Sequence, residues 1–357
     1  MKEELSKLLK WVLLLIAIPA GLYLGKTFLA PLAIGAVLAL MLIPVMDWFI
    51  SRKISKGFSV ALSTLILLLF FIFLGGLLFV QVKVIAKDWP EIEKQSGQYL
   101  EKAQRFVEEK SGLNPDQQLD KVKNVISKLG SSGPAALGSV GSVFANFILV
   151  IVYVVLLLSQ RDRFVAFILR HFPEQEHFRV RKAMKEIRKT SGGYFFGMLK
   201  AMMILAILYG AGFLIGGVKY AFLLALIAAV FSFIPYVGNV VGGGLAAVLA
   251  LVSGGPSSVL IVAIVMTAAQ MIDNYVTQPY VVGKEVDLNP FMTITSVIAF
   301  GILWGIPGAI IAIPVTGILR VLFEYLPKTK SLAFVMGNEK PEKFLLKKEP
   351  EDAGKNA

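Results

Sequence analysis

The stretch "AAQMIDNYVTQPYVV", residues 268–282, sets polar side chains into a strongly apolar run. Their spacings of three and four predict that they share one face of a helix. They are Gln270, Asp273, Asn274 and either Thr277 or Gln278. Polar groups without partners are costly in apolar surroundings, so this face should look toward protein or water. The carboxylate of Asp273 is suited there to hold a proton, a cation or a small polar molecule.

Two other apolar runs are broken by residues that disfavour helices. The first, "FSFIPYVGNVVGGG", contains Pro235, Tyr236, Gly238 and Asn239, followed by Gly242, Gly243 and Gly244. The second, "GILWGIPGAIIAIP", contains Gly305, Pro307 and Gly308. Such breaks free backbone groups that protein or water must satisfy. We predict that the first break and Asn239 line a polar cavity with the Asp273 face, while the glycines admit a neighbouring helix.

Enzymatic chemistry finds little support in the chain. The two histidines, His171 and His177, are six residues apart and lack the i, i+4 spacing of a zinc pair. There is no cysteine, no Gly-x-Ser-x-Gly elbow and no phosphate-binding Gly-x-x-x-x-Gly-Lys. We therefore expect no catalytic residues, no metal and no cofactor.

Composition predicts the elements that must position these residues. Hydrophobic residues make up 56% of the chain and charged residues 17%, whereas a soluble domain carries about 25% charged residues. The apolar blocks are of the length that a helix needs to cross a bilayer. They are 8–25, 28–50, 58–82, 138–159, 194–217, 219–252, 257–278 and 291–326. We predict an all-α, polytopic membrane protein of about eight transmembrane helices, whose first block is a retained span rather than a signal peptide.

Lysine and arginine are concentrated in alternate connections. They are dense before the first block, between the second and third, between the fourth and fifth, and after the eighth. The connections near Lys26, Lys219 and Lys284 are nearly bare. This bias predicts a multi-pass protein of the cell inner (plasma) membrane with both termini in the cytoplasm. It also accounts for the net charge of +12, so no nucleic-acid partner is expected.

One long polar excursion, residues 83–137, separates the third and fourth blocks. Apolar residues recur in it at helical spacing, which predicts two external amphipathic helices. One interpretation is that these helices lie on the membrane surface or cover the bundle. The other is that they form a partner-binding domain. The predicted organisation is three spans in 1–82, this excursion, five spans in 138–326 and a polar cytoplasmic tail in 327–357.

The two broken blocks are too long for a simple span. As continuous helices, 219–252 and 291–326 would measure about 51 and 54 Å, against a hydrocarbon core of about 30 Å. Two broken or re-entrant segments in one bundle are typical of the substrate site of a secondary transporter. The alternatives are that both are tilted, kinked helices, and that Asp273 is an interfacial cap.

Several motifs, in order from about residue 190 to 326, resemble the autoinducer-2 exporter family of bacterial and archaeal membrane proteins. They are "SGGYFFGMLKA", "FSFIPYVGNVVGGG", the Gln270, Asp273, Asn274 and Pro279 pattern, "GKEVDLNP" and "WGIPGAIIAIPVTGILRVLFEYL". The resemblance implies eight spans, cytoplasmic termini, no bound cofactor and homo-oligomers. Members are linked to export of a small polar furanone signal, while others resemble Na+/H+ antiporters. Many relatives carry Glu where this chain has Asp273.

Three hypotheses follow for a protein whose partners are the lipid bilayer and a small polar solute. The first is an exporter of a small polar metabolite or signal, such as autoinducer-2, that works by alternating access. The second is an antiporter that exchanges H+ for Na+ or another cation at Asp273. The third is a membrane scaffold without transport activity.

Overall fold

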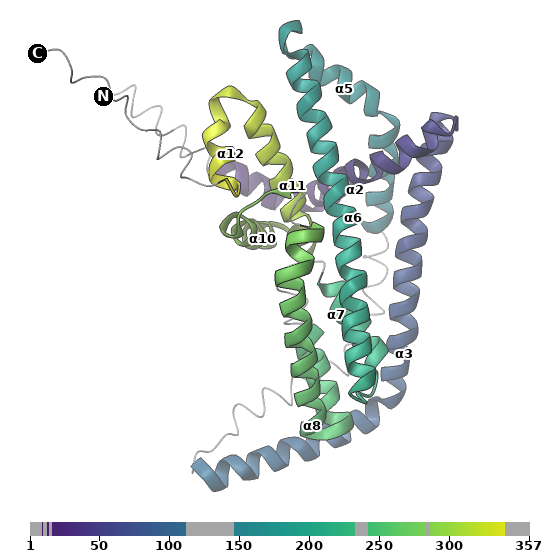
Figure 1. The fold of residues 1–357 in the computed structure, drawn as a ribbon, viewed down its shortest axis with the longest axis vertical. Helices are drawn as coiled ribbons and strands as arrows, with labels where there is room; N and C mark the ends of the chain where they lie inside the picture. Colours follow the sequence, from purple (N-terminus) through teal and green to yellow (C-terminus); the bar gives the residue numbers. More distant parts are fainter. Residues whose placement is uncertain are drawn as a thin grey trace, which may run out of the picture.

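The described residues of the computed structural model are 9, 13, 16–111, 146–232, 242–282 and 286–339, and they form helices and turns without a strand (Figure 1). The principal elements are α2 (Lys26–Ser51), α3 (Lys56–Ser111), α5 (Arg161–Arg170), α6 (His177–Ile215), α7 (Ala221–Phe231), α8 (Gly243–Ile272), η3 (Asp273–Val282), α10 (Pro290–Trp304), α11 (Ile306–Tyr325) and α12 (Lys330–Met336). A further helix covers Asn146–Ser159, and short 3-10 turns cover Glu174–Glu176 and Pro327–Thr329. The predicted all-α fold is confirmed.

Among the described residues, five helical segments are long and apolar enough to cross a membrane. They are Lys26–Ser51, Lys56–Leu77, Glu174–Ile215, Gly243–Thr277 and Ile306–Tyr325. Three shorter apolar helices, Asn146–Ser159, Ala221–Phe231 and Pro290–Trp304, complete the set. Where the structure describes them, the apolar blocks of the sequence therefore form helices, but several blocks do not coincide with single helices.

The boundary predicted between residues 252 and 257 falls inside α8. Two helical stretches meet there at Gly255, whose non-helical φ of 76° and ψ of −170° are readily available to glycine, and the second stretch folds back far enough for a Cβ on Gly243 to lie 2.9 Å from the Met266 methyl. Pro256 follows at once, where its missing N–H does not interrupt the helix that begins after the kink. The two apolar blocks that meet here are therefore separate helical stretches, and the turn between them is confined to Gly255 and Pro256.

Helix α3 continues well beyond the apolar block 58–82. It reaches Ser111, with Pro90 inside it, and its distal part bends and runs across the lower end of the bundle in Figure 1. The first predicted external helix is thus an extension of a span, not a separate element. The second, in 112–137, lies outside the described residues.

An ion pair and a hydrogen bond fasten this extension to the turn between α6 and α7. The Tyr220 hydroxyl donates to the Asp88 carboxylate, and Lys219 Nζ lies 3.3 Å from Asp88 Oδ2. The bond from Tyr220, and then the contact with Lys219, hold the pKa of Asp88 below its ordinary value of 3.8. Because the lowered pKa favours the carboxylate, the contact contributes above that value and is lost as the pH falls through the lowered pKa.

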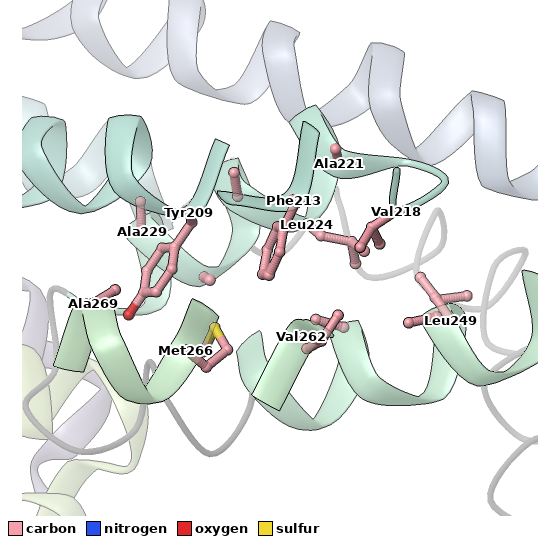
Figure 2. Close-up of a cluster of buried hydrophobic side chains, with 14 of the residues drawn as sticks. Tyr209, Phe213, Val218, Ala221, Leu224, Ala229, Leu249, Val262, Met266 and Ala269 are labelled. Atoms are coloured by element: carbon pink, nitrogen blue, oxygen red, sulfur yellow. The ribbon is translucent and has the colours of Figure 1, made fainter. Parts of the chain in front are cut away.

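Helix α6 is the centre of the bundle and contacts α2, α7, α8, η3 and α11. Its face toward α7 and α8 packs into an apolar cluster that includes Tyr209, Phe213, Leu224, Val262 and Met266 (Figure 2). All five side chains are at most 8% exposed. Because α6 is packed on several sides, its residues are held firmly relative to α8 and η3.

A helical hairpin forms the C-terminal part of the bundle. Helix α10 ends at Trp304 and α11 begins at Ile306, with Gly305 between them at φ 68° and ψ −147°. Pro307 lies in the first turn of α11, where its missing N–H costs nothing. Trp304 Nε1 donates to the Leu22 carbonyl at 2.9 Å, which joins the hairpin to the helical residues 16–24 that precede α2.

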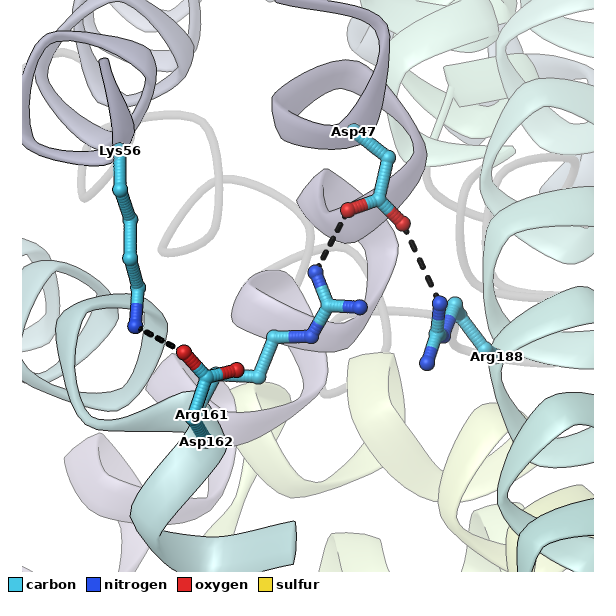
Figure 3. Close-up of polar contacts among 5 residues, drawn as sticks. All are labelled: Asp47, Lys56, Arg161, Asp162 and Arg188. Atoms are coloured by element: carbon cyan, nitrogen blue, oxygen red, sulfur yellow. Dashed lines mark hydrogen bonds and ion pairs between the residues drawn. The ribbon is translucent and has the colours of Figure 1, made fainter. Parts of the chain in front are cut away.

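Charged residues connect four helices near the N-terminal end of α6 (Figure 3). Asp47 of α2 accepts from Arg161 of α5 at 2.6 Å and from Arg188 of α6 at 3.2 Å. Beside it, Lys56 of α3 donates to Asp162 of α5 at 2.6 Å. One carboxylate therefore holds two guanidinium groups from different helices.

Replacing Asp47 with asparagine should lower stability noticeably, because it leaves Arg161 and Arg188 side by side without a carboxylate. We expect a loss of about 1 kcal/mol, a modest figure because all three side chains are partly exposed and screened by solvent. Thermal unfolding of the purified protein in detergent would measure it. Lys56→Gln is the control, since its exposed pair with Asp162 should contribute less than about 0.5 kcal/mol. Equal shifts for the two variants would contradict the central role of Asp47.

The clustering of basic residues at this end leads to a prediction of orientation. The Lys/Arg bias predicts that the end holding Arg161 and Arg188 faces the cytoplasm. A tag inserted at Gly112 should then be accessible from outside intact cells, while tags after Arg181 and at Ala357 should be protected. Protection at Gly112 together with exposure after Arg181 would reverse the orientation.

Candidate functional site

The polar stretch lies where helix α8 changes its winding. The α-helix ends at Ile272 and continues as the π-helical segment η3, Asp273–Val282. Pro279 falls inside this segment and has no N–H to donate, so a regular α-helical bond is impossible there. The wider π-helical turn accommodates this loss, and such turns occur frequently at functional sites. Asp273 is thus the first residue after the change.

The structure divides the predicted polar face into two. Asp273 and Thr277 are 7% and 1% exposed, on a segment that packs against α6. Gln270 is half-buried and Asn274 exposed, and Gln270 Nε2 donates to Asn274 Oδ1 at 2.7 Å. The buried polar groups facing the bundle are therefore those of Asp273 and Thr277. The backbone of Gln278 lies in η3, and its side chain is outside the described part of the chain.

Helix α6 supplies a tyrosine to the same region. Tyr209 is fully buried, shares a side-chain hydrogen bond with Ser232 and lies within electrostatic range of Asp273. Figure 2 shows its hydroxyl directed toward Ala269, one turn before Asp273. Ser232 follows α7 directly and donates to the Ala228 carbonyl at 2.7 Å. Three separate elements thus bring a carboxylate and hydroxyl groups to one place inside an apolar bundle.

The first predicted break begins immediately after Ser232. Its key residues, Pro235, Tyr236, Gly238 and Asn239, lie outside the described residues. The glycines that follow are described. A Cβ on Gly242 would meet the Cα of Ala228 in α7 at 2.5 Å, and one on Gly243 would meet the Met266 methyl at 2.9 Å. Gly242 therefore stands where the start of α8 comes close to α7, and Gly243 where it comes close to the stretch of α8 that follows Gly255.

The second break is not part of this arrangement. Gly305 separates α10 from α11, and the hairpin packs chiefly against α2, α6 and α12. Gly308 lies against the Phe300 backbone, where the two arms of the hairpin are closest. The predicted cavity joins only the first break to the Asp273 face, and among the described residues the hairpin does not pack extensively against η3.

Sequence reasoning missed two members of the Asp273 cluster, Tyr209 and Ser232. Tyr209 continues a stripe of buried residues on α6 at steps of three and four, which includes Ser191, Tyr194, Met198, Ala201 and Leu205. That stripe could have indicated from the sequence that Tyr209 is buried, and a buried tyrosine in an apolar span requires a polar neighbour. Which helix would supply that neighbour was not readable from the periodicity.

The two histidines lie in the polar connection leading into α6, away from this site. His171 Nδ1 is 2.9 Å from the Phe167 carbonyl, and His177 Nε2 is 2.9 Å from that of Leu169. Each ring therefore serves a local backbone contact. Among the described residues no group of three or more His, Cys, Asp or Glu side chains is placed to hold a metal ion.

Comparison with known proteins gives matches along almost the whole chain. The sequence profile described as "AI-2E family transporter" matches residues 12–328. The chain is 27% identical over 316 residues to "Putative transport protein MT0215" of Mycobacterium tuberculosis (strain CDC 1551 / Oshkosh), covering 85% of each chain. It is 26% identical over 317 residues to "Putative transport protein YueF" of Bacillus subtilis (strain 168), covering 84% of each. It is 20% identical over 338 residues to "Putative transport protein YhhT" of Escherichia coli (strain K12), covering 93% of this chain and 94% of the other.

Proposed function

Because this chain belongs to the AI-2E family of transporters, we propose that it is a secondary exporter of a small polar solute, such as a signal of the autoinducer-2 type. The chain is a multi-pass membrane transport protein by family and by its apolar helices. The proposal goes beyond this in four respects. It specifies a small polar solute, outward transport, an alternating-access mechanism in the plasma membrane, and assembly into homo-oligomers.

The observation that carries the proposal is the polar cluster of Asp273, Thr277, Tyr209 and Ser232, of which the first three are buried and Ser232 is half-buried. Polar and ionisable groups at membrane depth are expensive and mark substrate or ion pathways. A carboxylate can accept hydrogen bonds from a hydroxyl-rich molecule, and hydroxyl groups can both donate to it and accept from it, without any cofactor. A few polar groups among mostly apolar side chains are typical of sites that bind small molecules.

The same cluster supports a second candidate, exchange of a cation for a proton. A carboxylate with nearby hydroxyl oxygens is a suitable ligand set for a hard cation, and the carboxylate also takes up a proton. Asp273 is the only Asp or Glu in the segment Gly243–Thr277. Under this hypothesis the Asp273 carboxylate binds a proton and a cation in turn.

Transport by the purified protein in liposomes separates these functions. Export of a small polar solute that is driven without ATP supports the first, and coupled movement of protons and Na+ supports the second. Liposomes in which neither a panel of small polar metabolites nor Na+ moves faster than in empty vesicles would overturn both and leave the scaffold hypothesis.

A further inference from the structure

A cavity of about 530 Å³ lies far from Asp273, between the N-terminal turns of α6, the end of α11 and the helix α12. Its lining is basic and aromatic. The charged members are Arg179, Lys182, Arg320, Lys330, Glu324 and Glu339, and the aromatic ones are Phe178, Tyr325 and Phe334. The cavity stands at the C-terminal end of the apolar segment Ile306–Tyr325, whose charged residues, Arg320 and Glu324, both line it.

The wall formed by α12 is firmly built, although it belongs to the segment predicted as a polar tail. The Asn289 backbone N–H donates to the Met336 carbonyl at 3.0 Å, and Asn289 Nδ2 to the Val335 carbonyl at 2.7 Å. Asn338 Nδ2 donates to the Leu288 carbonyl at 3.0 Å. The end of α12 is therefore fixed to the loop before α10, and the cavity is not the gap beside a loose tail.

Arg320 forms the inner wall and is neutralised locally. It is 8% exposed, with Nη2 at 2.6 Å from Asp287 and Nη1 at 3.5 Å from Glu324. A Cβ on Gly337 would come within 2.9 Å of Arg320 Nε, so the chain after α12 closes over the guanidinium group. Arg320 thus shapes the cavity and ties α11 to the loop at Asp287.

The remaining charges leave an excess of cations facing the cavity. Arg179 is paired with Glu176 at 2.9 Å. Within the part of the chain that the structure describes, Lys182 of α6 and Lys330 of α12 have no ion pair, and Glu339 is the one lining acid left to offset them. Two ammonium groups from opposite walls, bordered by aromatic rings, suit an anion that carries an apolar portion.

We propose that this cavity binds a phosphate group between Lys182 and Lys330. Basic pockets between helices at a membrane surface take the phosphates of acidic lipids, and a soluble phosphate offers the same chemistry. Binding there would join α6 to α12 and so brace the hairpin, which α12 holds through Asn289. The site is independent of the proposed transport function, because its test is binding alone.

The test is a binding titration of the full chain, in detergent, by native mass spectrometry and thermal shift. The probes are phosphatidylglycerol, phosphatidylcholine as the neutral reference, and inorganic phosphate. We expect phosphatidylglycerol to bind and stabilise, and Lys182→Gln with Lys330→Gln to weaken it roughly tenfold. Binding of inorganic phosphate in place of the lipid, with the same loss in the variant, would identify a soluble source for the same group.

The control pair is Lys185→Gln with Lys328→Gln, which removes the same charge from α6 and the 3-10 turn without touching the cavity. It should leave binding within about twofold. General attraction of anions depends on total charge, which both pairs lower equally, so a larger loss in the cavity pair reports contact with its two lysines. The proposal is overturned if the control pair loses as much as the cavity pair. It is also overturned if phosphatidylglycerol and phosphate bind no better than phosphatidylcholine.

Discussion

Replacing Asp273 with asparagine is expected to abolish cation-coupled transport while the protein still folds. The substitution keeps the size and hydrogen-bonding capacity of the buried side chain but removes its titration. Under the antiport hypothesis, both the rate and its pH dependence should disappear, since the exchanging group is gone. Under the neutral-solute hypothesis, the rate should fall by roughly tenfold or more for a lost charged hydrogen bond, while the pH profile changes little.

Transport in liposomes across a range of pH, together with thermal unfolding, measures both effects. Tyr209→Phe should be assayed beside it, because Tyr209 is the titratable group on α6 that lies within electrostatic range of Asp273. Asp162→Asn makes the same chemical change at an exposed position on α5 and should leave transport unaltered. A wild-type rate and pH profile for Asp273→Asn would reduce Asp273 to a helix cap and remove the proposed site.

The second large effect is expected at Gly308, where the two arms of the C-terminal hairpin touch. A Cβ added there would overlap the backbone carbonyl of Phe300 and approach the Trp304 Cβ at 3.0 Å. A backbone carbonyl cannot move aside as a side chain can, so α10 and α11 must separate. We expect Gly308→Ala to cost about 1–3 kcal/mol and to lower the thermal midpoint by several degrees.

Gly301→Ala is the matched control within the same hairpin. Its Cβ would meet only the Cβ of Ala309, at an ordinary contact distance of 3.9 Å. Both changes replace a helical glycine by alanine and gain the same helix propensity, about 1 kcal/mol, so their difference isolates the close approach. Unfolding followed by circular dichroism would measure it. If the Gly308 variant were as stable as the Gly301 variant, the hairpin would not be tightly closed at this point.

The sequence alone determined the features that depend on local chemistry. Apolar blocks of spanning length predict membrane helices, because every backbone group in lipid must be bonded within its own helix. The separation of α10 from α11 at Gly305 follows from a residue that tolerates φ 68° two positions before a proline. Polar residues at helical spacing likewise placed Asp273 on a distinct face before any fold was known.

Tertiary structure decided which of those residues meet. Periodicity groups Gln270, Asp273 and Asn274 on a broad face, but only packing against α6 buries Asp273 and leaves Asn274 exposed. Nothing local to Tyr209 or Ser232 indicates that either joins this cluster. The continuation of α3 to Ser111 and the docking of α12 near Arg320 are also tertiary results. The physical reason is that spacing fixes the direction of a side chain on its own helix, whereas its partner depends on which helices pack together.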